Sequence, residues 1–463
     1  MTWKPEALPQ GRARYLAIAE SLARDVESGR LPPGERLPTH RELARQLGVN
    51  VGTVTRAYAE ARRRGLLDGE VGRGTFVRRQ GPGGEFQSDE VGAQATIDLA
   101  FNLPAGGPSA GQRRAALELL ARREDLGPCF DAYHTAGLLD HRAAAAAWLQ
   151  RGGIEASAER VLVTGGAQHA LAVCLASLTE AGDVVLAEAI TYPGIKALAG
   201  LLNRRLQGVA LDEHGIVPEA FDEACARSAA KLLYCMPSMH NPTGTVLPEE
   251  RRQEIARIAR RRGVIVIEDD TYGFLCETPP APIAVFAPER TYHVSSLSKC
   301  LGPGLRVGYL LAPTEPAGIF DQLVNSSSAM TWMAAPLMGE LASLWIRDGT
   351  VESVSRAKRA EARARQSIAR AALGCDDTVS DPGSCHLWLP LPEPWSAREF
   401  ARRAVAAGVA VTEPGPFVAS DPVMPKAVRL CLSTPPARAM LERGLEILAR
   451  ILALGPQRQT AIV

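Results

Sequence analysis

The stretch Ser296-Leu297-Ser298-Lys299-Cys300-Leu301-Gly302-Pro303-Gly304-Leu305-Arg306-Val307-Gly308-Tyr309 places a lysine and an arginine just after a predicted strand. Lys299 is one of 6 lysines in a chain that has 46 arginines. A lysine amine can form a Schiff base, whereas an arginine cannot because its guanidinium stays protonated. Arg306 lies seven residues later, and its planar fork suits a phosphate. The stretch therefore predicts a covalent lysine site beside an anion-binding arginine.

Short apolar runs recur on both sides of this stretch, with helical patterns between them. Alternating strands and helices predict an α/β fold with a mostly parallel sheet covered by helices on both faces. In such sheets ligands bind at the carboxyl ends of the strands. The strands expected are residues 161–163, 184–186, 208–211, 232–235, 264–267, 293–295 and 307–311.

Polar clusters follow several of these predicted strands. Thr164-Gly165-Gly166-Ala167-Gln168 opens a helix whose first N–H groups suit a phosphate, although this signal is weak alone. Asn241-Pro242-Thr243-Gly244 fits an ordinary turn as well as a binding loop. Glu268-Asp269-Asp270-Thr271-Tyr272 ends the most apolar strand. The carboxylates of this run are either solvated, or one of them points inward and can hold a cationic ring nitrogen.

Together these motifs resemble those of the fold-type I pyridoxal-phosphate enzymes, in the aminotransferase branch with kynurenine- and aminoadipate-type members. The resemblance covers residues 97–450. It implies pyridoxal 5'-phosphate as the cofactor and a smaller α+β domain at the C-terminal end. It also implies three catalytic residues. Lys299 forms the internal aldimine, Asp269 pairs with the pyridinium nitrogen and keeps the ring an electron sink, and Tyr272 contacts the ring hydroxyl.

The same resemblance implies the other cofactor contacts. Asn241 joins Tyr272 at the ring hydroxyl, and Tyr192 of Thr191-Tyr192-Pro193-Gly194 stacks on the ring. Arg429 of Arg429-Leu430-Cys431-Leu432-Ser433 binds a carboxylate of the substrate or effector. The residues around the phosphate are Gly166, Ala167, Gln168, Ser296, Ser298 and Arg306. The family often has serine where Ala167 stands, so this residue contributes its backbone alone.

The charge of the chain is divided unevenly. Residues 1–79 carry 15 Lys and Arg against 9 Asp and Glu, a net charge of +6, whereas the remainder carries −5. A small basic head on a larger acidic body indicates that the head works near a polyanion.

The head has the pattern of a helix-turn-helix followed by a wing. Its second helix begins at the capping box Thr39-His40-Arg41-Glu42, and Asn50 is expected to cap the third. Glycines at 72 and 74 indicate a hairpin between two short strands. The elements expected are helices over residues 12–30, 40–47 and 51–64, and strands over 66–70 and 75–78.

Short polar side chains and arginines of the head are suited to DNA. The expected DNA contacts are Thr39, Arg41, Thr53, Thr55, Arg56 and, at the wing tip, Arg73. The alternative is a three-helix bundle with a solvated arginine face. Leu37-Pro38-Thr39-His40-Arg41-Glu42-Leu43-Ala44 and Gly72-Arg73-Gly74-Thr75-Phe76-Val77 resemble the winged-helix domain of the GntR regulators, over residues 12–79. This resemblance favours DNA binding.

The predicted domains are a winged-helix domain over residues 1–79, a linker over 80–96 and an aminotransferase-like domain over 97–463. Within the last, the large subdomain is expected over 140–330 and the small subdomain over 97–135 and 345–455. This layout resembles the MocR family of bacterial regulators. The resemblance implies a homodimer that binds double-stranded promoter DNA and senses an amino compound or the vitamer itself.

Two other functions stay open from the sequence. One is a working aminotransferase that carries a DNA-binding domain, since the transamination residues are complete. The other is a DNA-binding protein with an inactive body, which the retention of Lys299 and Asp269 disfavours. An effector that engages both Lys299 and Arg429 must carry a primary amine and an acidic group. An amino acid or a taurine-like sulfonate has this chemistry, and pyridoxal phosphate itself is the competing effector.

Several classes of protein are excluded. The first ten residues lack the apolar segment of a signal peptide, and no apolar run approaches the roughly 18 residues of a membrane span. The 9 cysteines contain no C-x-x-C spacing. They are therefore expected to be reduced core thiols, with neither disulfides nor a metal site. These features predict a cytoplasmic protein that does not bind membranes.

Overall fold

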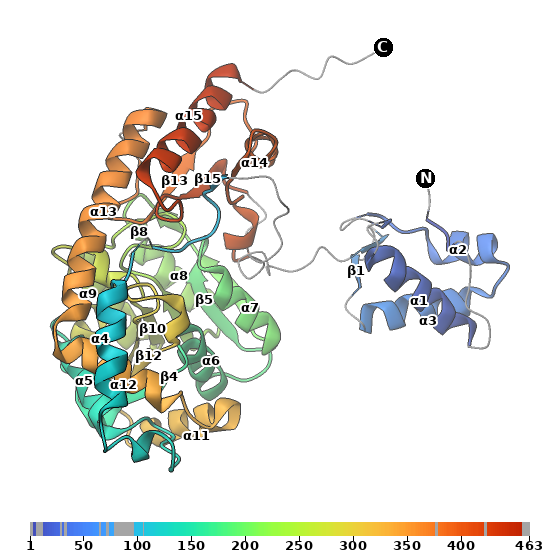
Figure 1. Cartoon of the computed structure of the whole chain (residues 1–463). Helices are drawn as coiled ribbons and strands as arrows, with labels where there is room; N and C mark the ends of the chain where they lie inside the picture. Colours follow the sequence, from blue (N-terminus) through green and yellow to red (C-terminus); the bar gives the residue numbers. More distant parts are fainter. Residues whose placement is uncertain are drawn as a thin grey trace. The chain divides into compact units, whose positions relative to one another are not determined.

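The computed structural model describes residues 3–5, 13–27, 30–31, 35–63, 66–70, 74–77, 97–104, 106–375, 378–420 and 424–455. The chain divides into two compact units, Met1–Phe86 and Gln87–Val463, called here the head and the body (Figure 1). The predicted linker and Arg73 lie outside the described residues. Over the part of the chain that is described, no helix is long and apolar enough to cross a membrane.

The head contains the predicted elements in the predicted order. Its core is formed by apolar side chains from all three helices and from the wing, among them Ile18, Leu43, Val54 and Val77. The two wing strands pair in antiparallel fashion. The elements are α1 Arg14–Glu27, α2 His40–Leu47, α3 Val51–Arg63, β1 Leu67–Glu70 and β2 Gly74–Val77. The expected winged helix-turn-helix is therefore confirmed.

Local hydrogen bonds fix the turn between α2 and α3. The Thr39 hydroxyl accepts a hydrogen bond from the Glu42 amide at 3.3 Å, and the Glu42 carboxylate accepts one from the Thr39 amide at 2.8 Å, which completes the predicted capping box. Gly48 ends α2 in the left-handed region at φ 60°. Asn50 Oδ1 accepts a hydrogen bond from the Gly52 amide at 2.8 Å at the start of α3. The two helix ends are thus set by the residues that the sequence indicated.

The body is built on a seven-stranded sheet of order β4-β12-β11-β10-β9-β5-β6. Strands β6, β5, β9, β10 and β11 are parallel, and β12 runs antiparallel to both of its neighbours. The expected mostly parallel sheet is confirmed. The strands are β4 Val161–Thr164, β5 Val184–Glu188, β6 Arg205–Val209, β9 Leu232–Cys235, β10 Ile265–Asp269, β11 Thr291–Ser296 and β12 Gly308–Leu311.

Alternate residues of the central strands enter different cores on the two faces. Tyr234 and Ile267 pack with α6 and α7, whereas Leu233 and Val266 pack with α8 and α9. Burial on both faces explains why these strands are nearly continuous apolar runs. The helices of the body up to α12 are α4 Ala110–Ala121, α5 Leu139–Gln150, α6 Ala167–Leu178, α7 Pro193–Leu201, α8 Pro218–Arg227, α9 Glu249–Arg262, α10 Ile283–Phe286, α11 Ile319–Thr331 and α12 Pro336–Arg347.

The third predicted strand, over residues 208–211, overlaps the observed strand β6 only at its first two residues. The chain forms β6 three residues earlier and then a small hairpin, β7 Leu211–Asp212 with β8 Gly215–Ile216. Asp212 Oδ1 accepts a hydrogen bond from the His214 amide at 2.8 Å. This local side-chain bond favours a turn over a continued strand.

The C-terminal part of the body has its own core. Ile97 and Leu99 pack there with Leu387 and Leu430, whereas Ala116 and Leu120 of α4 pack in the core that contains α5 and α12. The long helix α13 lies beside α15 (Figure 1). The elements are α13 Thr350–Leu373, α14 Ala397–Ala406 and α15 Arg438–Leu454, the antiparallel pair β13 His386–Pro390 and β15 Ala427–Cys431, and the parallel pair β3 Ile97–Asp98 and β14 Val409–Ala410.

Candidate functional site

Lys299 lies three residues after β11, where the polar side chains of several strands meet. Its ammonium donates a hydrogen bond to the backbone carbonyl of Asn102 and lies 5.7 Å from the centre of the Tyr272 ring. The Tyr272 hydroxyl accepts a hydrogen bond from Asn102 Nδ2 at 2.9 Å. The structure therefore brings two of the three predicted catalytic residues, Lys299 and Tyr272, together through Asn102.

Asp269, at the end of β10, is a buried carboxylate with three hydrogen bonds. Oδ2 accepts from the Tyr234 hydroxyl at 2.9 Å, and Oδ1 accepts from the Thr271 hydroxyl at 2.6 Å and the Thr271 amide at 3.1 Å. Burial raises the pKa of Asp269, although the hydrogen bonds from Thr271 and Tyr234 oppose this effect. A cation placed against this carboxylate would favour its charged form.

The glycines at the start of α6 form a cradle of backbone amides. Gly166 has φ 97° and precedes the helix, and the first amides of a helix have no partner within it. A Cβ on Gly308 of β12 would lie 2.6 Å from the Gly166 carbonyl carbon, so only a glycine permits this approach. Arg306 Nη2 donates to the Gly165 carbonyl at 2.8 Å, which holds the guanidinium at the cradle.

Ser296, the last residue of β11, and Ser298, two residues later, differ in their hydrogen bonding. Ser296 Oγ donates to the Val307 carbonyl at 3.1 Å and accepts from the Ser298 amide at 3.1 Å. Ser298 Oγ is buried and makes no hydrogen bond within the described part of the chain. A buried hydroxyl without a partner is costly unless a ligand supplies one. The hydroxyl, the helix amides and Arg306 together suit a phosphate group.

The side chains of Tyr192 and Gln168 both lie against the Cα of Gly194. A Cβ on Gly194 would lie 2.2 Å from the Tyr192 ring and 2.5 Å from Gln168 Oε1. Gln168 Nε2 donates to the Gly194 carbonyl at 3.2 Å. The side chain of Gln168 is thus bound to the start of α7, and its phosphate contact, like that of Ala167, would come from the backbone amide.

Arg429 and Asn241 contact one another. Arg429 is fully buried in β15, and its Nη1 donates to Asn241 Oδ1 at 2.8 Å. Its Nη2 donates to the Ala100 carbonyl at 2.7 Å, and its guanidinium lies 4.8 Å from the centre of the Phe417 ring. The sequence assigned Asn241 to the cofactor and Arg429 to a carboxylate, and the structure links these two positions directly.

Sequence reasoning missed three residues of the site. Asn102 comes from an extended segment before α4, and its only sequence signal is the turn-forming run around Pro104 and Gly106. Tyr234 is an inward residue of β9 and looks like any core residue. Lys358 of α13 donates to the Lys299 carbonyl at 3.0 Å and to the Pro104 carbonyl at 3.1 Å, and burial lowers its pKa to about 8.

The head presents the predicted DNA contacts on α2 and α3. Thr39, Arg41, Thr55 and Arg56 are exposed, and Thr53 is half-buried. The Thr55 hydroxyl lies 3.3 Å from His40 Nδ1, so the start of α2 and the first turns of α3 are adjacent. Arg73 lies outside the described residues.

Two family models match the chain. Residues 95–448 match the model described as aminotransferase class I and II, a family that typically binds pyridoxal phosphate, and residues 14–77 match bacterial regulatory proteins of the gntR family. The helix-turn-helix match implies DNA binding. The two matches confirm the two resemblances expected from the sequence.

Relatives and solved structures agree with these matches. The chain is 32% identical over 453 residues to the uncharacterized HTH-type transcriptional regulator YdeF of Bacillus subtilis, covering 98% of this chain and 97% of that one. It is 30% identical over 313 residues to the HTH-type pyridoxine biosynthesis transcriptional regulator PdxR of Corynebacterium glutamicum, covering 66% of this chain and 67% of that one.

Among solved structures, the body resembles LysN, the α-aminoadipate aminotransferase of Thermus thermophilus, in complex with N-(5'-phosphopyridoxyl)-L-leucine. The TM-score is 0.69 and the identity 27%, over 80% of this chain and 96% of that chain. Both the regulator and the enzyme similarities extend over most of the body. The chain therefore belongs to the MocR-type family of HTH transcriptional regulators, in which a GntR-type helix-turn-helix domain is fused to a class I and II aminotransferase domain.

Proposed function

We propose that this regulator binds pyridoxal 5'-phosphate covalently through Lys299 and adjusts its binding of double-stranded promoter DNA to an amino compound or to the vitamer. One observation carries the proposal: the Lys299 amine, the buried Asp269 carboxylate and the cradle of backbone amides at α6 lie in one body, and Ser298 Oγ has no partner among the described residues. These groups fit a cofactor that has an aldehyde, a cationic ring nitrogen and a phosphate.

Each group of the site has a separate task in this proposal. When bound, the cofactor supplies an electron sink for reactions at the amino carbon. Asp269 holds the proton on the ring nitrogen, and its bonds from Tyr234 and Thr271 keep it oriented. Asn241 and Tyr272 bind the ring hydroxyl, and Tyr192 covers the ring. Gly166, Ala167, Gln168, Ser296, Ser298 and Arg306 hold the phosphate.

If the effector is an amino compound, its chemistry follows from Lys299 and Arg429: it carries a primary amine and an acidic group. Only a primary amine can exchange with Lys299, and the Arg429 guanidinium can bind a carboxylate or sulfonate with two hydrogen bonds. Arg429 now donates to Asn241 Oδ1 and to the Ala100 carbonyl, so an acidic ligand would compete with these two acceptors. PdxR, a relative named for pyridoxine biosynthesis, supports the competing idea that the vitamer is the signal.

We propose that the functional unit is a homodimer. Phe130, Tyr133 and Trp332 are exposed aromatic residues of the body, at 67%, 75% and 66% exposure. The rings of Tyr133 and Trp332 lie 5.5 Å apart, so these two side chains form one apolar patch. Such a patch is typical of a protein interface, and a symmetric dimer would present two heads to paired DNA half-sites.

A working aminotransferase remains the second candidate, because the similarity to LysN covers 80% of this chain and 96% of that chain, and because the chain has Arg429 as a candidate carboxylate ligand. The discriminating measurement is turnover. The chain is incubated with an amino acid and a 2-oxo acid acceptor, and product is followed over time. Product beyond one equivalent per chain establishes an enzyme, whereas a single equivalent with a change in DNA affinity supports a sensor.

The covalent link is tested on Lys299 itself. The Lys299→Ala variant should fold and dimerise but lose both the visible absorption of the bound cofactor and the borohydride-stable adduct. Lys231→Ala removes an exposed lysine of the same body and is the control, which should keep both signals. An adduct that persists in Lys299→Ala would contradict the assignment.

A further inference from the structure

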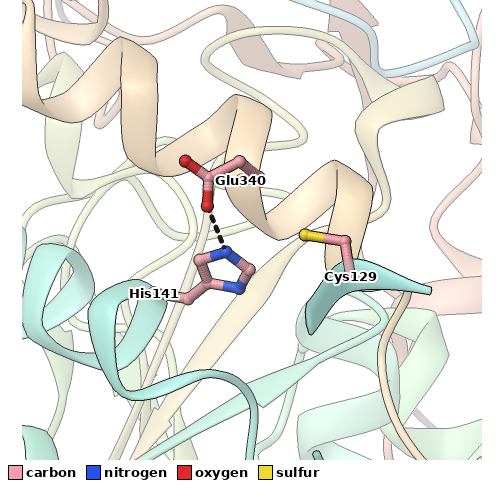
Figure 2. Close-up of side chains that lie close together, drawn as sticks. All are labelled: Cys129, His141 and Glu340. Atoms are coloured by element: carbon pink, nitrogen blue, oxygen red, sulfur yellow. Dashed lines mark hydrogen bonds and ion pairs between the residues drawn. The ribbon is translucent and has the colours of Figure 1, made fainter. Parts of the chain in front are cut away.

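A second polar cluster lies outside the cofactor site, where three separate segments meet. Cys129 ends the short turn Gly127–Cys129, His141 lies in α5 and Glu340 lies in α12. All three side chains are buried, and their ligand atoms lie within 4.8 Å of one another. Figure 2 shows the Cys129 sulfur directed toward the pair formed by His141 and Glu340.

Glu340 is held in place by groups on both of its oxygens. Oε2 accepts a hydrogen bond from His141 Nε2 at 2.8 Å, and Oε1 accepts one from Arg123. The Arg123 guanidinium is also bound by Asp125, at 2.7 and 2.8 Å. Metal-binding carboxylates are commonly oriented by such outer hydrogen bonds.

The fold makes room for the imidazole in this position. A Cβ on Gly339 would lie 2.7 Å from His141 Nδ1, so a glycine in α12 allows the ring to lie against that helix. His141 Nε2, the other ring nitrogen, faces Glu340 Oε2. The ring is therefore fixed with one nitrogen against the helix and the other aimed into the cluster.

A second arginine lies farther from Glu340. Arg347 Nη1 is 3.9 Å from Glu340 Oε1, its side chain is nearly half exposed, and its Nη2 donates to the Asp140 carbonyl at 3.1 Å.

We propose that Cys129, His141 and Glu340 form a zinc site. One sulfur, one nitrogen and one oxygen make a borderline-soft ligand set, which Zn²⁺ accepts in tetrahedral geometry. Bond lengths of about 2.0–2.3 Å place tetrahedral ligand atoms about 3.3–3.6 Å apart. The 2.8 Å contact between His141 Nε2 and Glu340 Oε2 is shorter than this, so the pair would open to admit the ion while Cys129 moves toward it, and water completes the coordination.

The cysteine spacings predicted no zinc site, because zinc motifs usually place several ligands close together in the chain. This site instead uses one cysteine, and its three ligands come from distant segments. Zinc there would fasten the turn at Cys129 to α5 and α12. Phe130, the next residue, is 67% exposed, and Tyr133 of the apolar patch proposed for dimerisation follows three residues later. The metal would thus fix the chain immediately beside that surface.

The first test measures zinc retained by the full-length, tag-free chain after chelator treatment, reduction and dialysis against zinc. One zinc per chain is expected. Cys129→Ala and His141→Ala should weaken the affinity by more than about tenfold. Cys174→Ala removes a buried thiol of α6 that is not part of the cluster and should bind zinc like the unaltered chain. Substoichiometric zinc in the unaltered chain, or equal affinity in Cys129→Ala, would overturn the proposal.

The second test does not depend on a variant that folds. Zinc X-ray absorption of the unaltered chain should show one sulfur at about 2.3 Å and nitrogen or oxygen ligands at about 2.0 Å. A spectrum without a sulfur ligand, or with two or more, assigns the metal elsewhere and overturns the site. Neither readout requires the cofactor, so this inference can fail while the proposed function stands.

Discussion

The ammonium of Lys358 donates a hydrogen bond to the backbone carbonyl of Lys299 at 3.0 Å. A buried lysine therefore contacts the backbone of the lysine proposed to bind the cofactor. Its other hydrogen bond goes to the Pro104 carbonyl, two residues after Asn102, so one ammonium holds both segments that meet at the site. This placement gives Lys358 an electrostatic effect on Lys299 as well as a positioning one.

Removing the charge of Lys358 should raise the pKa of the Lys299 nitrogen. Burial lowers the pKa of Lys358 to about 8, so this group is still mostly a cation at pH 7 and disfavours a second positive charge nearby. In Lys358→Met the pH midpoint of the visible spectrum of the cofactor-loaded chain should rise by roughly 0.5 pH unit. Lys231→Met, at an exposed position, is the control, and an unchanged midpoint in Lys358→Met would contradict the prediction.

Glu188 should give the body a distinct pH dependence. Burial raises the pKa of Glu188 to about 7 from 4.5, and neighbouring His240 is neutral because burial lowers its pKa to about 4. At Glu188 the native state therefore binds more protons than the unfolded state between pH 4.5 and 7, so the contribution of this carboxyl group to stability falls as the pH rises through this window.

The Glu188→Gln variant removes this titration. As the pH rises from 4.5 to 8, the free energy of unfolding of the variant should increase relative to that of the unaltered chain, by at most about 3 kcal/mol. Urea unfolding of both proteins across this range measures the difference. Glu180→Gln, an exposed carboxylate, should show no such trend. A difference in free energy of unfolding that stays constant with pH would contradict the raised pKa of Glu188.

The contact between β12 and the glycine cradle should not tolerate a methyl group. A Cβ on Gly308 would lie 2.6 Å from the Gly166 carbonyl carbon, which is backbone and cannot swing aside. Gly308→Ala should destabilise the body by about 1–3 kcal/mol and weaken cofactor binding. Gly304→Ala is the matched control, because no atom lies within 4 Å of its added Cβ. Equal cofactor affinity in both variants would disprove the close approach.

Arg429 distinguishes the two effector classes. If an amino acid is the signal, Arg429→Ala should keep cofactor binding but lose the spectral change on adding the amino acid and the change in promoter affinity. An exposed body arginine, Arg402→Ala, should retain both. A full promoter response of Arg429→Ala to cofactor alone, seen by footprinting, identifies the vitamer as the effector instead.

Arg56 tests the DNA-binding face. It is exposed on α3, and one lost phosphate contact lowers the slope of log affinity against log salt by about 0.9. Arg56→Ala should therefore bind promoter DNA more weakly and with a shallower salt dependence, measured by fluorescence anisotropy. Arg398→Ala, exposed on the body, should leave the slope unchanged. An unchanged slope in Arg56→Ala would place the DNA elsewhere.

Local chemistry explains what could be predicted from the sequence. The capping box at Thr39 and the apolar strand ending at Asp269 are short-range patterns, and both elements form where expected. The hairpin after Val209 was missed because the Asp212 side chain binds its own backbone, an effect that apolar periodicity does not report.

The rest of the site depends on contacts between distant residues. Asn102 reaches Tyr272 across 170 positions of the chain, and Arg429 reaches Asn241 across 188. Such pairings exist only once the sheet and the C-terminal core have packed. The cluster of Cys129, His141 and Glu340 has the same origin, because three unrelated segments supply one ligand atom each.

Helix α13 is hydrogen-bonded to two parts of the site, the Lys299 segment and the segment that follows β15. Lys358 binds the Lys299 carbonyl, and two turns later Arg365 donates to the Leu432 and Pro435 carbonyls at 2.8 and 2.7 Å, just beyond the strand that carries Arg429. Seven helical residues span about 10 Å, so two attachment points on one helix brace the Lys299 segment and the end of the Arg429 strand against the same element.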